Sequence, residues 1–315
     1  MPLHPVIQAE LAVAAGATPY YRLPLAEARE AARRPYLARA TQPPVAVVRD
    51  IDVPGPHGDL PVRLYTPFEA GPRPLVVFFH GSGFTLLDLD THDDLCRRLC
   101  VASGCVVASV DYRLAPEHKF PAGPDDCTAA TLWLAAQAPA LGCIEGAFAL
   151  AGDSAGACLA IATALELRDG DGPEPRALLM WYPVTDHPSS GWPSYVDFAQ
   201  GCGLTAEGMA WFWSQYLLDE SQIAAASPLR APTLAGLPPT WVMTAEYDVL
   251  RDEGEAFAQR AQREGVPVQV QRAARLNHGF LKYAGEIDEA TQAIATAGTW
   301  LGATVQARAT EDTTQ

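Results

Sequence analysis

Ser154 has the sequence surroundings of a nucleophile. It lies in GDSAG at 152–156, between an apolar segment at 147–152 that predicts a strand and an alanine-rich segment at 155–168 that predicts a helix. A turn this tight leaves no space for side chains at its flanking positions, and both are glycine. It lifts the serine hydroxyl above the sheet and aims a helix N-terminus at the reacting centre. The pattern therefore predicts nucleophilic attack by Ser154, with the resulting oxyanion stabilised by backbone N–H groups.

His278 is the predicted base. A serine hydroxyl is a poor nucleophile at neutral pH and needs an adjacent base. After a strand–turn–helix nucleophile of this kind, the acid and then the histidine follow in the chain. The seven histidines are at positions 4, 57, 80, 92, 118, 187 and 278, and only the last follows a suitable acid. It lies in NHGF at 277–280, just beyond the last predicted strand.

Asp248 is the predicted acid. It follows the strand predicted at 240–246 and would hold the imidazole tautomer and stabilise the imidazolium. Glu246 is its local rival. Asp252 is assigned instead to capping or solvating the next helix.

A second glycine-rich turn supplies the predicted oxyanion hole. HGSGF at 80–84 follows the strand predicted at 74–80. Its small residues let the backbone turn N–H groups toward a substrate carbonyl. The predicted donors are the N–H groups of Ser82, Gly83 and Ala155.

Eight strands must position these residues. We expect them at 45–53, 60–65, 74–80, 105–110, 147–152, 177–183, 240–246 and 266–272, with main helices at 92–103, 124–137, 155–168 and 253–264. The later strands are continuous apolar runs separated by helices, which indicates a mostly parallel sheet buried on both faces. The predicted fold class is α/β, with one eight-stranded sheet flanked by helices in a single domain spanning 1–315.

Two segments interrupt this alternation. Residues 1–44 are predicted to be helical and polar, and residues 184–226 are rich in aromatic side chains. An insertion above the carboxyl ends of the strands would cover a site there. The alternative is a helical excursion that packs its own small core.

The composition excludes several classes of partner. With 22 basic and 37 acidic residues, the net charge of −15 disfavours nucleic acid and stable membrane association. No apolar run is long enough to predict a membrane span, and residues 1–16 lack the pattern of a signal peptide. Seven cysteines, an odd count, predict free thiols in a reduced, cytoplasmic protein. Cys96 and Cys100 share a helix, but no second ligand pair follows, so neither a metal nor a cofactor is expected.

Together these segments resemble the hormone-sensitive-lipase-like family of bacterial esterases, the alpha/beta-hydrolase fold-3 group. The matching segments are HGSGF at 80–84, DYRLAPEHKFPA at 111–122, GDSAG at 152–156, YPVTD at 182–186, AEYDVLRDEG at 245–254 and NHGF at 277–280. The resemblance implies that Ser154, Asp248 and His278 form a catalytic triad. Two departures are His-Gly-Ser-Gly in place of the family's His-Gly-Gly-Gly, and Asp-Val-Leu at 248–250 in place of Asp-Pro-Leu.

The resemblance also implies a cap formed by 1–44 and 184–226 over a catalytic core of 45–183 and 227–305. It implies a polar network behind the oxyanion loop that includes Asp111, Arg113 and Glu117, and a homodimer formed through the last strand. The aromatic residues expected to line a hydrophobic substrate pocket are Phe84, Trp181, Trp192, Phe198 and Trp211.

The expected function is a carboxylesterase that hydrolyses small-molecule esters with short acyl chains through an acyl-enzyme. Amide or lactone hydrolysis by the same triad is a related alternative. The second alternative is a non-catalytic small-molecule receptor on this fold. Such receptors of the family typically lack the catalytic histidine, which is present here as His278.

Overall fold

Eight strands form one sheet, as the sequence predicts. In the computed structural model, which describes residues 2–81 and 83–312, they are β1 (Val47–Gly55), β2 (Gly58–Thr66), β3 (Arg73–Phe79), β4 (Val106–Val110), β5 (Cys143–Asp153), β6 (Leu178–Trp181), β7 (Thr240–Tyr247) and β8 (Val268–Asn277). Their order is β1-β2-β4-β3-β5-β6-β7-β8. β2 runs antiparallel to both of its neighbours, and all the other pairs are parallel. The α/β class with a mostly parallel sheet is confirmed.

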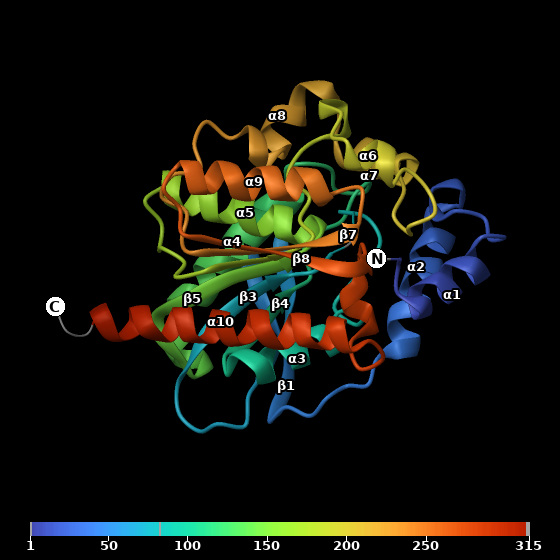
Figure 1. Cartoon of the computed structure of the whole chain (residues 1–315). Helices are drawn as coiled ribbons and strands as arrows, with labels where there is room; N and C mark the ends of the chain where they lie inside the picture. Colours follow the sequence, from blue (N-terminus) through green and yellow to red (C-terminus); the bar gives the residue numbers. More distant parts are fainter. Residues whose placement is uncertain (1, 82, 313–315) are drawn as a thin grey trace.

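Helices cover both faces of the sheet (Figure 1). α3 (Asp93–Ser103) and α10 (Asp288–Asp312) lie on one face, and α4 (Ala122–Ala136), α5 (Ala155–Asp169) and α9 (Arg251–Arg263) lie on the other. Alternate residues of a strand point to opposite faces, so the sheet separates two hydrophobic clusters. On β6, Leu178 and Met180 pack on the side of α5, whereas Leu179 and Trp181 pack on the side of α10.

The parallel strands bring their carboxyl ends to one edge of the sheet. Phe79 at the end of β3 pairs with Gly152 of β5, and Asp153 of β5 pairs with Trp181 of β6. β8 extends to Asn277, five residues beyond its predicted end. The residues that follow β3, β5, β7 and β8 therefore meet at the same edge.

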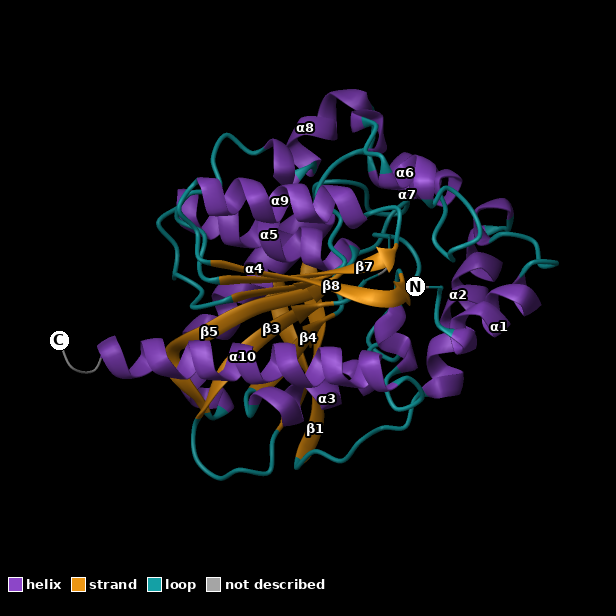
Figure 2. Cartoon of the chain, in the orientation of Figure 1, coloured by secondary structure: helices purple, strands orange, loops and turns teal. Residues whose placement is uncertain are grey.

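Short helices from two distant segments gather at this end. The first segment contains α1 (Pro5–Ala14), η1 (Tyr20–Arg22) and α2 (Leu25–Arg39), and the second contains η3 (Pro188–Ser190), α6 (Ser194–Asp197), α7 (Ala206–Tyr216), η4 (Glu220–Gln222) and α8 (Ile223–Ala226). In Figure 2, α1, α2, α6 and α7 lie on the side toward which β7 and β8 point. The ring of Tyr20 stacks on that of Phe212, 5.3 Å between centroids, so the two segments contact each other. The remaining short helices are η2 (Ala138–Leu141), η5 (Pro228–Arg230) and η6 (Phe280–Tyr283).

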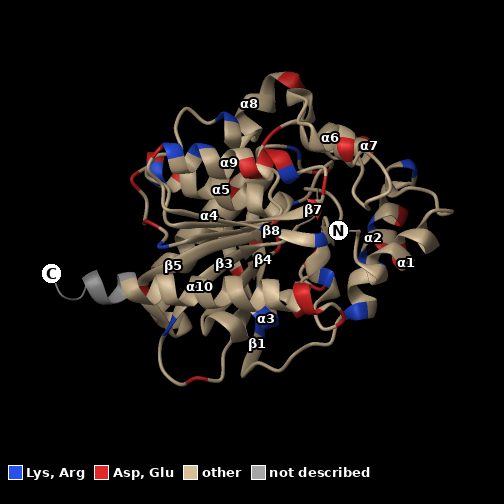
Figure 3. Ribbon diagram, in the orientation of Figure 1, with Lys and Arg blue, Asp and Glu red and all other residues tan. Residues whose placement is uncertain are grey.

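Charged positions lie mainly on the helices and loops around the sheet (Figure 3). None of the helices that the structure describes is long and apolar enough to cross a membrane.

Candidate active site

The turn at Ser154 is as tight as its sequence predicts. β5 ends at Asp153 and α5 begins at Ala155, which leaves Ser154 alone between them with φ 55° and ψ −121°. A Cβ at position 152 would collide with the backbone of Gly156, and a Cβ at 156 would collide with the carbonyl of Phe79. Glycine at both positions is therefore what allows α5 to start directly behind the serine.

Ser154, His278 and Asp248 form a hydrogen-bonded row. Oγ of Ser154 lies 2.8 Å from Nε2 of His278, and Nδ1 of the same ring lies 2.8 Å from Oδ2 of Asp248. The second oxygen of Asp248 accepts the N–H of Leu250 at 3.0 Å. Asp248 and Ser154 are buried, at 1% and 8% exposure, and the side chain of His278 between them is 13% exposed.

The structure separates Asp248 from its two neighbouring carboxylates. Glu246 accepts the backbone N–H of Arg275 at 2.7 Å. Asp252 accepts the N–H of Ser194 at 2.8 Å. Asp248 is thus the member of this acidic group that contacts His278.

Two of the three predicted oxyanion donors can be located. Ala155 is the first residue of α5, where a backbone N–H has no partner within the helix. Gly83 has φ 55°, and the ring of Phe212 from α7 occupies the space where a Cβ would lie. Ser82 lies outside the described residues.

The loop that carries Gly83 is held from several sides. Gly81 donates its N–H to Oδ1 of Asp153 at 2.7 Å, and Tyr112 donates its hydroxyl to the carbonyl of His80 at 2.6 Å. Arg29 of α2 donates to the carbonyl of Thr85 at 2.9 Å. The loop is therefore bound to the nucleophile turn, to the core and to the N-terminal segment.

The charged residues of the segment DYRLAPEHKFPA were expected to form one polar network. In the structure, Asp111, Arg113 and Glu117 each contact a residue outside the segment. Arg113 forms a two-pronged ion pair with buried Asp126, with both distances 2.8 Å. Glu117 forms a second such pair with Arg29 of α2, again with both distances 2.8 Å. Asp111 lies 3.9 Å from Nε2 of His80. Each charged residue thus connects the segment to a different neighbour.

Four of the five aromatic residues expected in the pocket belong to one hydrophobic cluster. Phe84 stacks on Tyr216 of α7 at 3.8 Å between centroids, and the other three, Trp192, Phe198 and Trp211, pack partly buried against the same cluster. Trp181 is fully buried on the opposite face of the sheet. Alternation along β6 turns its side chain toward α10, so we leave Trp181 out of the proposed pocket.

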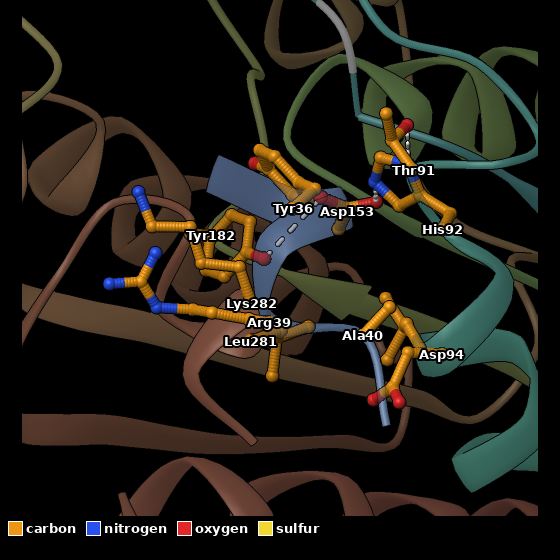
Figure 4. Close-up of a pocket in the computed structure, with 11 residues that line it drawn as sticks. Tyr36, Arg39, Ala40, Thr91, His92, Asp94, Asp153, Tyr182, Leu281 and Lys282 are labelled. Atoms are coloured by element: carbon orange, nitrogen blue, oxygen red, sulfur yellow. Dashed lines mark hydrogen bonds and ion pairs between the residues drawn. The ribbon is translucent and has the colours of Figure 1, made fainter. Parts of the chain in front are cut away.

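A small cavity lies behind the nucleophile turn (Figure 4). Its volume is about 20 Å³, and its lining includes Asp153, His92, Tyr182 and Tyr36. The ring of Tyr182 also meets that of His278 edge-on, 4.8 Å between centroids. Sequence reasoning assigned no role to His92, Tyr182 or Tyr36. Only the position of Asp153 inside the pentapeptide could have drawn attention to this group.

Charge and burial are balanced around this cavity. Burial opposes ionisation of Asp153, but the charge of His92 and the hydrogen bond from Gly81 hold its pKa below the usual range. Burial and the nearby charge of His92 lower the pKa of His80 to about 3, so His80 is neutral. Burial raises the pKa of Tyr182 well above its ordinary value.

The cysteines form no disulfide, and six of the seven are buried. Burial raises the pKa of the Cys96 thiol, and Cys100 donates its thiol hydrogen to the carbonyl of Tyr65. Within the described part of the chain, no group of three or more His, Cys, Asp or Glu side chains is placed to hold a metal ion.

Comparison with known proteins identifies the family. The family model described as alpha/beta hydrolase fold matches residues 76–282. The chain belongs to this family, in its hormone-sensitive-lipase-like group of esterases. The esterase LipI of Mycobacterium tuberculosis is 39% identical over 282 residues, which cover 87% of this chain and 88% of that protein.

Further relatives support the same assignment. An ethyl acetate hydrolase of Pseudomonas putida is 36% identical over 241 residues, covering 75% of this chain and 76% of the relative. The solved structure of a hyperthermophilic esterase from the archaeon Pyrobaculum calidifontis superposes with a TM-score of 0.92 at 37% identity, covering 96% and 99% of the two chains. The protein described here, as a member of this esterase family, is a carboxylic ester hydrolase.

Asp248 contacts His278, whereas Glu246 contacts the backbone of Arg275, so replacing these two acids should have different effects. Asp248→Asn should lower kcat on p-nitrophenyl acetate by about 100-fold or more, because the amide favours the wrong tautomer of His278. Glu246→Gln is the matched control, since its amide oxygen can still accept the N–H of Arg275. It should keep kcat within about twofold of the parent. Equal losses in the two variants would contradict the assignment of Asp248.

Proposed function

We propose that this protein is a carboxylesterase that hydrolyses short-acyl esters, with Ser154 as nucleophile, His278 as general base and Asp248 as the acid that orients it. The observation that carries the proposal is the row of two 2.8 Å contacts from Ser154 through His278 to Asp248. In this row the serine proton has an acceptor in place, and the acceptor has a carboxylate that stabilises its positive charge.

The reaction follows from this geometry in two halves. Oγ of Ser154 bonds to the ester carbonyl carbon while its proton moves to Nε2 of His278. The tetrahedral intermediate then expels the alcohol, which takes that proton, and an acyl-enzyme remains. Water, deprotonated by His278, attacks the acyl carbon, and the proton returns to Ser154 as the acid leaves.

Backbone donors stabilise the charge that develops on the carbonyl oxygen. We assign this role to the N–H groups of Ser82, Gly83 and Ala155. The dipole of α5 adds to it, because the helix begins at Ala155 with its N-terminus toward the site.

Ser154→Ala should abolish acyl transfer. We expect kcat on p-nitrophenyl acetate to fall by a factor of about 10⁴ or more, because the covalent route is lost. The parent should take up one equivalent of a fluorophosphonate probe, measured by intact mass, and the variant none. A parent that remains unlabelled and inactive would instead support the receptor alternative. Activity confined to matched amides or lactones would support the other hydrolase alternative.

The short-acyl preference is supported by the aromatic residues over the site. Phe212 contacts Gly83 of the oxyanion loop and stacks on Tyr20, while Trp211 meets Tyr20 edge-on. Rings packed against one another from two segments leave little room for a long chain next to the acyl carbon. The name of the ethyl acetate hydrolase among the relatives points the same way. In this proposal, residues 1–44 and 184–226 form the cap.

The acyl-chain profile tests this preference. Across p-nitrophenyl esters from acetate to dodecanoate, kcat/KM should be highest at two to six carbons and at least about tenfold lower at twelve. Trp211→Ala should move the maximum toward longer chains, because it removes a large ring from the cap. A parent profile that rises steadily to twelve carbons would refute the short-acyl assignment.

We also propose a homodimer through β8, which lies at one end of the strand order. An edge strand carries unpaired backbone groups that invite pairing, and Val270 on β8 is 41% exposed. Light scattering at micromolar concentration should give twice the chain mass for the parent. Val270→Lys should shift the mass toward the monomer, because a charge on the edge disfavours pairing. A monomeric parent would exclude this dimer.

The thiols support a reducing compartment, and we propose the cytoplasm. All seven cysteines are free. Free thiols are typical of reducing compartments, because oxidising compartments favour disulfides.

A further inference from the structure

His92 and Asp153 form a buried pair directly behind Ser154. His92 immediately precedes α3, and Asp153 immediately precedes the nucleophile. Their exposures are 1% and 3%. Nε2 of the histidine lies 3.2 Å from Oδ1 of the carboxylate, and Figure 4 shows both side chains at the same cavity. The triad mechanism uses neither of them.

The contacts around His92 hold its ring with Nε2 toward Asp153. The hydroxyl oxygen of Thr91 lies 3.0 Å from Nδ1 of His92 and 2.7 Å from the carbonyl oxygen of Asp88. Nε2 faces a carboxylate, which would repel a bare lone pair, so the ring presents an N–H to Asp153.

The contact between His92 and Asp153 is electrostatic, and its geometry is not that of a straight hydrogen bond. The Nε2–H has no acceptor in line with it among the described residues. The cavity of about 20 Å³ beside the pair has room for one water molecule. The other basic groups at the cavity do not take the place of His92. Arg39 and Lys282 are paired with Glu10, and His80 is neutral.

Asp153 transmits this charge contact to the oxyanion loop. Its Oδ1, the oxygen nearest His92, also accepts the N–H of Gly81 at 2.7 Å. Its Oδ2 accepts the hydroxyl of Tyr182 at 3.4 Å. An unpaired carboxylate at this position would be costly to bury and would also repel an oxyanion forming next to Ser154. The N–H of His92 opposes both effects, because it stabilises the negative charge of the carboxylate.

We propose that His92 is a positioning residue for ester hydrolysis: through Asp153 it holds the start of the oxyanion loop, and its N–H stabilises the buried carboxylate beside the oxyanion. His92 itself does not touch the substrate. This inference rests on the proposed function, because it assumes that the loop at 80–84 stabilises an oxyanion at Ser154.

Four variants test the proposal: His92→Ala, Asp153→Asn, the double variant, and Cys96→Ala as a matched control. Cys96 is fully buried one turn further along α3, so its truncation reports the cost of a smaller core alone. Each variant is titrated to completion with a fluorophosphonate, so that kcat is expressed per reactive serine. KM for p-nitrophenyl acetate and Ki for phenylboronic acid, a tetrahedral analogue, are measured alongside.

In His92→Ala, kcat per reactive serine should fall about 10- to 100-fold, because misplaced oxyanion donors cost rates of this size. KM should stay within about twofold, and Ki should weaken in proportion to kcat. The loss in the double variant should match that of the worse single variant within about threefold, because both residues act through one contact. Cys96→Ala should keep kcat within about twofold.

Two results would overturn the proposal: kcat of His92→Ala within twofold of the parent, or single losses that simply multiply in the double variant. Failure of the proposed function looks different, because the parent would then take up no fluorophosphonate and show no turnover.

Discussion

The close approach of α5 to β3 is the constraint on which the rest of the site depends. Gly156 lies so near the carbonyl of Phe79 that no side chain fits between them, so the helix can begin immediately after Ser154. This forces the serine into a positive φ, a strain on the order of 1–3 kcal/mol that the packed surroundings must hold. In return, one short turn presents a hydroxyl, a free backbone N–H and a helix dipole to the same point in space.

The same turn creates a problem that the neighbouring segments solve. When Ser154 points out of the sheet, Asp153 before it is forced inward and becomes a buried carboxylate. This carboxylate is stabilised by His92, which immediately precedes α3, and by the N–H of Gly81. The loop after β3, the start of α3 and the turn at Ser154 thus meet at one buried carboxylate, and this ties the geometry of the loop to that of the turn.

Much of this could be predicted from the sequence, because each feature has a local cause. The eight strands follow from apolar runs, and Ser154, Asp248 and His278 follow from the order of the strands that carry them. β8 ends five residues beyond the predicted position, because residues 273–277 (AARLN) lack the apolar, β-branched run that marks a buried strand. Trp181 packs in a different cluster from the other four aromatic residues expected in the pocket, because its register on β6 decides its direction. His92 was missed because it is marked only by the partner it meets in the folded chain.

The helical segments before β1 and after β6 are where local reasoning reaches its limit, and this limit has a physical cause. Phe212 presses on Gly83, Tyr20 stacks on Phe212, and Arg29 binds the carbonyl of Thr85. These contacts join residues from both segments to the loop at 80–85, and no sequence period encodes them. In the proposed function, the side chains over the site and the backbone donors of the oxyanion hole therefore form one packed unit. A substitution that enlarges the pocket then also alters the support of the loop, so we expect acyl-chain preference and catalytic rate to change together.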